Sequence, residues 1–329
     1  MIAAAGLRTH IWNNNLKSIV LMAGFPLLLL ALTYAGTLFF IAYSVDAPGQ
    51  QEFALALDWT LSAIPFVLVA AGVWFIIAWL GYQKMIDAAT GARTVRRADE
   101  PKLYNLLENL CISRGLTMPA LRIIETPALN AYATGLSERQ AAVTVTRGLM
   151  DSLEDDELEA VLAHELTHIR NRDVRLLVIS VIFVGIISFV GQLFARGMLR
   201  GSMVRAGGAR RGGGGNAGVL ILVALAIVAL SYVLALLIRF AMSRKREYMA
   251  DAGAVELTRN PDAMIGALRK ISGRSAIEEA PEEVRQMFLD NDTASFAGLF
   301  TTHPPIPKRI AALVEYGGGR SYANAMSQE

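Results

Sequence analysis

The chain has 329 residues, of which 53% are apolar and only 18% charged, and its mean hydropathy is +0.40. Ordinary soluble proteins carry about 25% charged residues, so the composition excludes that class and indicates a membrane protein. The formal net charge of +2 gives no reason to expect a nucleic-acid partner. A single cysteine, Cys111, excludes a disulfide scaffold, and its leucine-rich surroundings predict a buried side chain.

Four uncharged runs account for the excess of apolar residues, at 18–45, 59–83, 176–195 and 219–238. Each reaches the ~20 residues that a helix needs to cross the hydrocarbon core. Basic residues precede the first run and follow the second, whereas the loop between these two runs is acidic. The positive-inside rule therefore places the N-terminus and the segment after residue 83 in the cytoplasm.

The loop between the third and fourth runs is rich in arginine and glycine, which complicates the topology. Either both runs span the bilayer and the loop is translocated despite its charge, or the pair inserts shallowly and the loop stays cytoplasmic. We favour full spanning because both runs have ~20 apolar residues. Either arrangement returns the chain after residue 238 to the side that holds residues 84–175.

Two soluble segments thus share one side of the membrane, and we expect them to form one domain. The expected organisation is a transmembrane hairpin at 1–83, a first catalytic segment at 84–175, a second hairpin at 176–238 and a second catalytic segment at 239–329. Apolar spacing after Pro101 predicts a helix, and strand-like runs follow at 121–124, 131–134 and 142–146. A further helix is predicted from Ser152 to Arg172.

This last helix carries the sequence His164-Glu165-Leu166-Thr167-His168. Residues four apart share one face of a helix, so both imidazoles can point at one metal ion, with Glu165 beside the first of them. Zinc held by such ligands lowers the pKa of a bound water to about 7, and a neighbouring carboxylate can accept its proton. Two histidines that merely pack on an amphipathic helix are the weaker interpretation.

A catalytic zinc commonly has three protein ligands, so a third must come from elsewhere. Glu247 and Asp251 stand one turn apart after the fourth run, where one carboxylate could bind metal and the other could hold a metal-bound histidine, His164. From the residues alone, a solvated collar of charges with Arg244, Lys245 and Arg246 remains an open alternative.

Four separated motifs together resemble the HtpX family of bacterial membrane-bound heat-shock zinc metalloproteases. These are the histidine helix with Asn171 and Asp173 after it, the run 243–251, the run 130–135, and His303-Pro304-Pro305 with Arg309. The resemblance covers most of the chain from Lys102 to Leu313. CAAX-prenyl proteases share the zinc pattern but have more membrane helices than four runs can supply.

The resemblance implies about four transmembrane helices and an α+β, zincin-like cytoplasmic domain whose small sheet has an edge strand. It implies one zinc ion per subunit on His164, His168 and Glu247, with Glu165 as general base. Asp251 would hydrogen-bond a zinc-bound histidine, His303 would stabilise the oxyanion, and Arg309 would orient His303 or support charge in the site. The edge strand would align the substrate backbone through Asn130, Ala131, Tyr132 and Ala133. Judged alone, the Asn130 run is typical of any strand after a turn, and His303 of a loop before a helix.

We therefore expect a metalloendopeptidase of the bacterial inner membrane whose active site faces the cytoplasm. Its expected substrates are membrane proteins or unfolded polypeptides in protein quality control, and its oligomeric state stays open. A transporter is disfavoured because the four runs lack ionisable residues. The alternative function is a catalytically inactive zinc-binding scaffold or regulator in the membrane.

Overall fold

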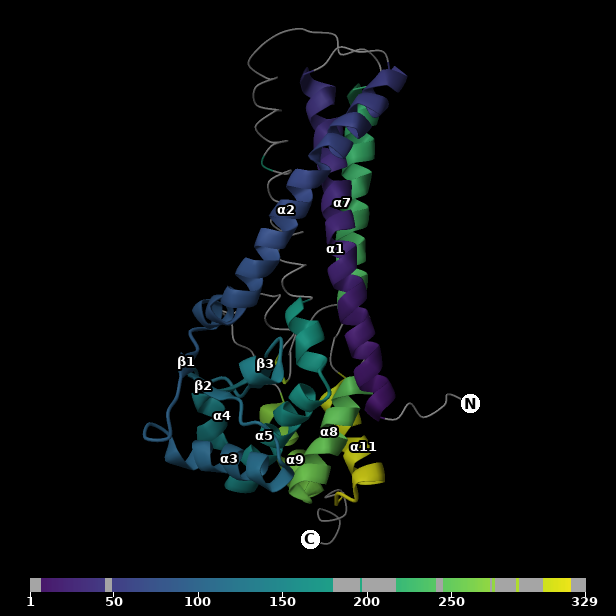
Figure 1. Ribbon diagram of the computed structural model, residues 1–329. Helices are drawn as coiled ribbons and strands as arrows, with labels where there is room; N and C mark the ends of the chain where they lie inside the picture. Colours follow the sequence, from purple (N-terminus) through teal and green to yellow (C-terminus); the bar gives the residue numbers. More distant parts are fainter. Residues whose placement is uncertain are drawn as a thin grey trace. The chain divides into compact units, whose positions relative to one another are not determined.

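The computed structural model describes residues 7–44, 49–179, 196, 217–240, 245–272, 274–275, 288–289 and 304–320. The chain divides into two units (Figure 1). The first comprises Met1–Lys17, Gly81–Ile179 and Phe240–Glu329, and the second comprises Ser18–Leu80 and Ser180–Arg239. Each unit thus combines segments that are distant in sequence.

The second unit contains most of three long apolar helices, α1 (Leu7–Ser44), α2 (Gly49–Thr90) and α7 (Ala217–Phe240), whose remaining residues belong to the first unit. Stretches of α1 (Trp12–Ala42) and α2 (Gln51–Thr90) are long and apolar enough to cross a membrane, and α7 contains a shorter apolar stretch, Gly218–Val233. Small and aliphatic side chains of the three helices pack together, among them Leu38, Ala56 and Leu220. The predicted run at 176–195 lies largely outside the described residues.

A small mixed sheet lies in the first unit, in the order β1-β2-β4-β3. Its strands are β1 (Arg93–Thr94), β2 (Ala120–Ile124), β3 (Ala131–Thr134) and β4 (Ala142–Thr146). Strands β2 and β4 are parallel, and the outer strands pair antiparallel with them. The three predicted strands are confirmed to within one residue, whereas β1 is too short to leave a pattern. The order makes β3 an edge strand.

Helices α4 (Arg147–Ser152) and α5 (Asp155–Arg170) contact this sheet. The same unit also contains α3 (Pro101–Arg114), α8 (Lys245–Thr258), α9 (Pro261–Ile271) and α11 (Ile306–Gly317). Leu107, Val143, Leu162 and Leu268 belong to one continuous apolar core. Cys111 is buried in it as predicted, and burial raises the pKa of its thiol to about 11.

The predicted helix from Ser152 to Arg172 is wrong at both ends. Ser152 closes the short helix α4, and Leu153 is extended. Helix α5 is capped instead by Glu154, whose backbone N–H donates to Glu157 Oε2 at 2.9 Å in a capping box. At the other end Arg172 has a φ of 59°, which ends the helical path.

Helices α5 and α8 approach closely where Gly253 faces Thr167. A Cβ atom on Gly253 would overlap the Thr167 side chain, whose hydroxyl is fixed by donation to the Ala163 carbonyl at 2.8 Å. Any larger residue at 253 must therefore push the two helices apart.

We predict that Gly253→Ala lowers the free energy of unfolding by about 1–3 kcal/mol, the usual cost of overpacking. The apparent unfolding temperature of the purified protein measures this loss. Gly81→Ala is the matched control, because a Cβ there meets nothing within 4 Å. An unchanged unfolding temperature for Gly253→Ala would contradict the close approach.

Candidate metal centre

Two imidazoles of α5 point at the same space. His164 and His168 lie one turn apart on the buried side of the helix, with their Nε2 atoms 3.1 Å apart and their ring planes at 84°. Ring nitrogens at this separation cannot both carry a hydrogen toward each other, so the arrangement suits a shared cation.

Helix α8 adds a carboxylate to this pair. Glu247 Oε2 lies 3.7 Å from His164 Nε2 and 3.8 Å from His168 Nε2. Two ligand atoms on a tetrahedral zinc, each bonded at about 2.0–2.1 Å, are separated by about 3.3 Å. The two nitrogens and the oxygen therefore form a donor set and spacing that fit one zinc-sized ion.

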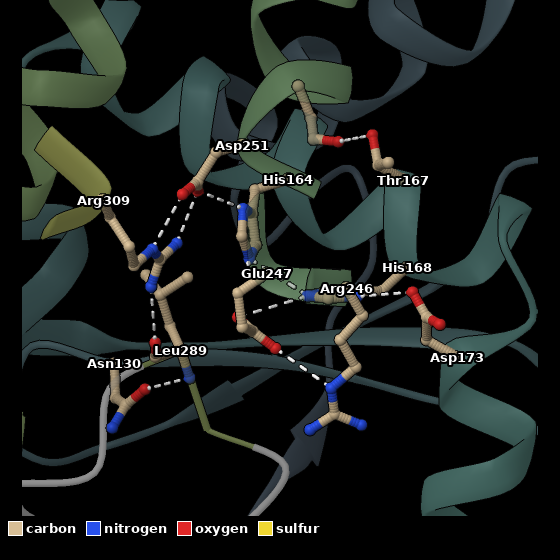
Figure 2. Close-up of polar contacts among 11 residues, drawn as sticks. Asn130, His164, Thr167, His168, Asp173, Arg246, Glu247, Asp251, Leu289 and Arg309 are labelled. Carbon is tan, nitrogen blue, oxygen red and sulfur yellow. Dashed lines mark hydrogen bonds and ion pairs between the residues drawn. The ribbon is translucent and has the colours of Figure 1, made fainter. Parts of the chain in front are cut away.

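Neither Glu247 nor Asp251 belongs to a solvated collar of charges. Their exposed fractions are 1% and 2%, so neither carboxylate is solvated. Arg246 is also buried, and its Nε donates to Glu247 Oε1 at 3.2 Å. This contact leaves Oε2, the other carboxylate oxygen, on the side of the imidazoles (Figure 2).

Asp251 and Arg309 fix the position of His164. Asp251 Oδ1 lies 3.0 Å from His164 Nδ1, the ring nitrogen that points away from the shared space. Arg309 donates to both oxygens of Asp251, from Nη2 at 2.6 Å and from Nε at 2.9 Å. Burial by itself would raise the pKa of Asp251, but the Arg309 guanidinium and His164 outweigh it and hold that pKa at about 2. Asp251 therefore stays ionised.

Asp173 does for His168 what Asp251 does for His164. Its Oδ2 lies 3.0 Å from His168 Nδ1, and its Oδ1 accepts a hydrogen bond of 2.7 Å from Asn14 Nδ2. Asn14 also donates to the Asn171 carbonyl, at 3.3 Å. Each imidazole thus has one carboxylate on its Nδ1 side, which orients the ring and makes its Nε2 a better metal ligand.

The surrounding carboxylates favour positive charge in the shared space. Burial alone would lower the pKa of His168, but the negative charges of Glu247 and Asp173 outweigh it and raise that pKa to about 10. The same field that would hold a proton on His168 attracts a metal cation.

Glu165 follows the first imidazole on α5 and is buried with it. Burial raises the pKa of its carboxyl and the negative charge of Glu247 acts in the same direction, whereas His164, His168 and Arg309 oppose the shift. A raised pKa makes a carboxylate a stronger proton acceptor, which suits a general base.

Asn130 directly precedes the edge strand β3. The Asn130 backbone N–H donates to Thr146 Oγ1 at 2.9 Å, and its Nδ2 donates to the Ser275 carbonyl at 2.7 Å. Asn130 Oδ1 accepts from the backbone N–H groups of Ala131, at 2.9 Å, and Leu289, at 3.0 Å. The four predicted residues Asn130 to Ala133 are all buried, and His303 lies outside the described residues.

The structure thus brings together His164, Glu165, His168, Glu247, Asp251 and Arg309, which the sequence analysis had singled out. It also adds Asp173 and Arg246. From the sequence, Asp173 was noted only as part of the motif after the second histidine. A carboxylate five residues after His168 could have indicated a partner for that imidazole. Arg246 was considered only as a partner in a surface collar. Leu289 left no signal in the sequence, because a single leucine forms no pattern.

This site has two ring nitrogens and a carboxylate around one point and a buried glutamate beside them. These groups define the site of a metal-dependent hydrolase, and the motif on α5 indicates the metallopeptidase class of such enzymes. Residues 97–316 match peptidase family M48. A protein of Bacteroides fragilis named Protease HtpX homolog is 45% identical over 322 residues, which cover 94% of this chain and 99% of the relative. The chain belongs to family M48 and is a membrane metalloprotease of the HtpX type.

Further relatives show the same name at greater distance. A Protease HtpX homolog of Listeria monocytogenes is 38% identical over 262 residues, which cover 77% of this chain and 86% of the relative. Among solved structures, S. mikatae Ste24p is similar with a TM-score of 0.42 and 18% identity, covering 92% of this chain and 66% of that one.

We predict that Asp173→Asn weakens metal binding about 10–100-fold, because His168 loses the carboxylate that orients its ring. Competition with a fluorescent chelator measures the affinity of the purified protein. Asp155→Asn is the control, since Asp155 is an exposed residue at the start of α5, the helix that carries His168. Equal affinities in both variants would show that Asp173 has no such role.

Proposed function

We propose that the metal is zinc, one ion per chain, held by His164, His168 and Glu247. The observation that carries this proposal is the convergence of two Nε2 atoms and one carboxylate oxygen at mutual distances of 3.1 to 3.8 Å. Two imidazoles and one carboxylate form a known donor set of catalytic zinc, which keeps a fourth position open.

The proposed reaction is hydrolysis of internal peptide bonds. Zinc, when bound, would supply a Lewis acid that acidifies water and polarises the scissile carbonyl. Glu165 accepts the proton of the attacking water and passes it to the leaving amine. Asp251 and Asp173 keep the imidazoles oriented, and Arg309 keeps Asp251 ionised. Asn130 to Ala133 align the substrate backbone by strand addition, and His303 stabilises the negative charge on the carbonyl oxygen.

The proposed setting is the bacterial inner membrane, with the active site on the cytoplasmic side. In this arrangement residues 1–83 and 176–238 form two spanning hairpins, and residues 84–175 and 239–329 together form the catalytic domain. The length of the four uncharged runs supports four spans, and the positive-inside pattern around the first two runs supports a cytoplasmic site. A tethered site favours substrates at the bilayer, so we propose membrane proteins and unfolded polypeptides, with no nucleic-acid partner.

We predict that Glu165→Gln abolishes cleavage of an unfolded model protein while the zinc content stays at one per chain. The amide cannot accept the proton of water, but it leaves the three proposed ligands intact. Glu159→Gln is the control on the same helix. A strong chelator should abolish cleavage by the wild type, and added zinc should restore it. Retained cleavage by Glu165→Gln would refute its role as base, and activity indifferent to chelation would refute the metal mechanism.

A labelling experiment tests the proposed four spans. In a Cys111→Ala background, a cysteine at Ser202 should react with a membrane-impermeant maleimide from outside intact cells whose outer membrane has been opened. Tyr316→Cys is the control, because Tyr316 is highly exposed and belongs to the proposed cytoplasmic domain. It should react only after the inner membrane is permeabilised. If Ser202→Cys also requires permeabilisation, the proposed four spans are wrong. The third and fourth runs then insert shallowly and the loop between them is cytoplasmic.

A further inference from the structure

The outward edge of β3 is already paired with another part of the chain. The Asn130 carbonyl accepts from the backbone N–H of Thr146, so this residue is turned toward β4. Residues alternate along a strand, and the Ala131 carbonyl accordingly faces outward. There it accepts a hydrogen bond of 2.8 Å from the backbone N–H of Leu289.

Three groups bind the backbone of Leu289: the Ala131 carbonyl and the Asn130 side chain bind its N–H, and Arg309 binds its carbonyl. Its N–H also donates to Asn130 Oδ1 at 3.0 Å, and its carbonyl accepts from Arg309 Nη1 at 3.1 Å (Figure 2). Arg309 is the same side chain that holds Asp251 and, through it, His164. Leu289 is therefore two side chains away from a proposed zinc ligand.

Phe288 gives the direction of this pairing. Its ring lies 5.3 Å from the ring of Tyr132, between centroids, while Leu289 pairs with Ala131. The order 288 to 289 thus runs against the order 131 to 132, which makes the pairing antiparallel. Both side chains are buried, so the pairing includes side-chain packing as well as backbone contacts.

The edge is closed to another strand where Leu289 pairs with Ala131. Asn130 and Ala131 are 0% and 1% exposed, although the proposed function needs them to bind a substrate backbone. Hydrogen-bond groups that are already satisfied and covered cannot receive a second strand. Substrate and Leu289 must therefore exclude each other at this point.

We propose that Phe288 and Leu289 are a built-in mimic of a substrate, which occupies the edge strand in place of two substrate residues and competes with them. The proposal rests on the proposed function. It also identifies the preferred substrate class: an extended polypeptide with a leucine-sized apolar residue opposite Ala131 and an aromatic residue before it, against Tyr132.

Competition of this kind acts on KM and leaves kcat unchanged, because the productive complex is the same once the mimic has left. If the edge is free in one molecule of ten, the apparent KM is about tenfold above the intrinsic value. A merely structural role of Leu289 predicts the opposite, a loss of kcat or of folded protein when its contacts are removed.

The decisive comparison is Leu289→Pro with Leu289→Ala, assayed on a quenched fluorescent peptide that contains Phe-Leu. Both variants lose the leucine side chain, but only proline also removes the N–H that binds Asn130 and Ala131. We expect KM to fall several-fold in Leu289→Pro, less in Leu289→Ala, with kcat and zinc content unchanged in both. An equal or higher KM for Leu289→Pro, or a lower kcat with normal zinc content, overturns the proposal.

A second measurement does not depend on how the variants fold. A capped peptide with the sequence of residues 286–291 should inhibit the wild type competitively. The same peptide with N-methyl-leucine, which lacks the N–H, and one with aspartate in place of leucine should inhibit much less. The mimic proposal is wrong if all three peptides inhibit equally or if the unmodified peptide does not inhibit. In either case, cleavage by the wild type still supports the proposed function. Absence of cleavage by every form of the enzyme refutes both.

Discussion

The close packing of α8 on α5 is the constraint on which the metal centre depends. Local helix geometry brings the two imidazoles together on α5. The third donor, Glu247, comes from α8, which two apolar runs separate from α5 in the sequence. Gly253 lets the helices approach until the Glu247 carboxylate oxygen is within 4 Å of both ring nitrogens. Charges buried this deeply are stable only when each has a partner, and the pairs Asp251 with Arg309 and Glu247 with Arg246 provide it.

Arg309 connects the metal centre with the edge strand. Its guanidinium has a planar fork of donors, so it can hold both oxygens of Asp251 and still reach the Leu289 carbonyl. A lysine could not make these contacts with the same geometry. The group that orients a proposed zinc ligand therefore also binds the backbone that lies along β3. Occupation of the edge and the geometry of the centre are linked through this one side chain.

A second connection runs from α1 to the other imidazole. Asn14 belongs to the stretch Trp12–Ala42, which is apolar and long enough to cross a membrane, and it donates to the Asp173 carboxylate beside His168. Asp173 in turn stands three residues before Leu176, where an apolar run begins. The N-terminal part of α1 and the orientation of His168 thus share one hydrogen-bond network.

The sequence by itself determined what depends on local spacing. The length of the uncharged runs predicted the apolar helices, and residue patterns predicted three of the four strands. The spacing of four between His164 and His168 predicted that they would share a helix face. Glu247 and Asp251 were found because their helix repeats the same one-turn spacing, and the resemblance to a family added Asn130, His303 and Arg309. Only the tertiary structure decided which charges meet: that Asp251 pairs with Arg309, that Asp173 and Asn14 support His168, and that Leu289 covers β3. These contacts join residues up to about 160 positions apart, and no local pattern records them, because their energy comes from burial and pairing that exist only after the chain has folded.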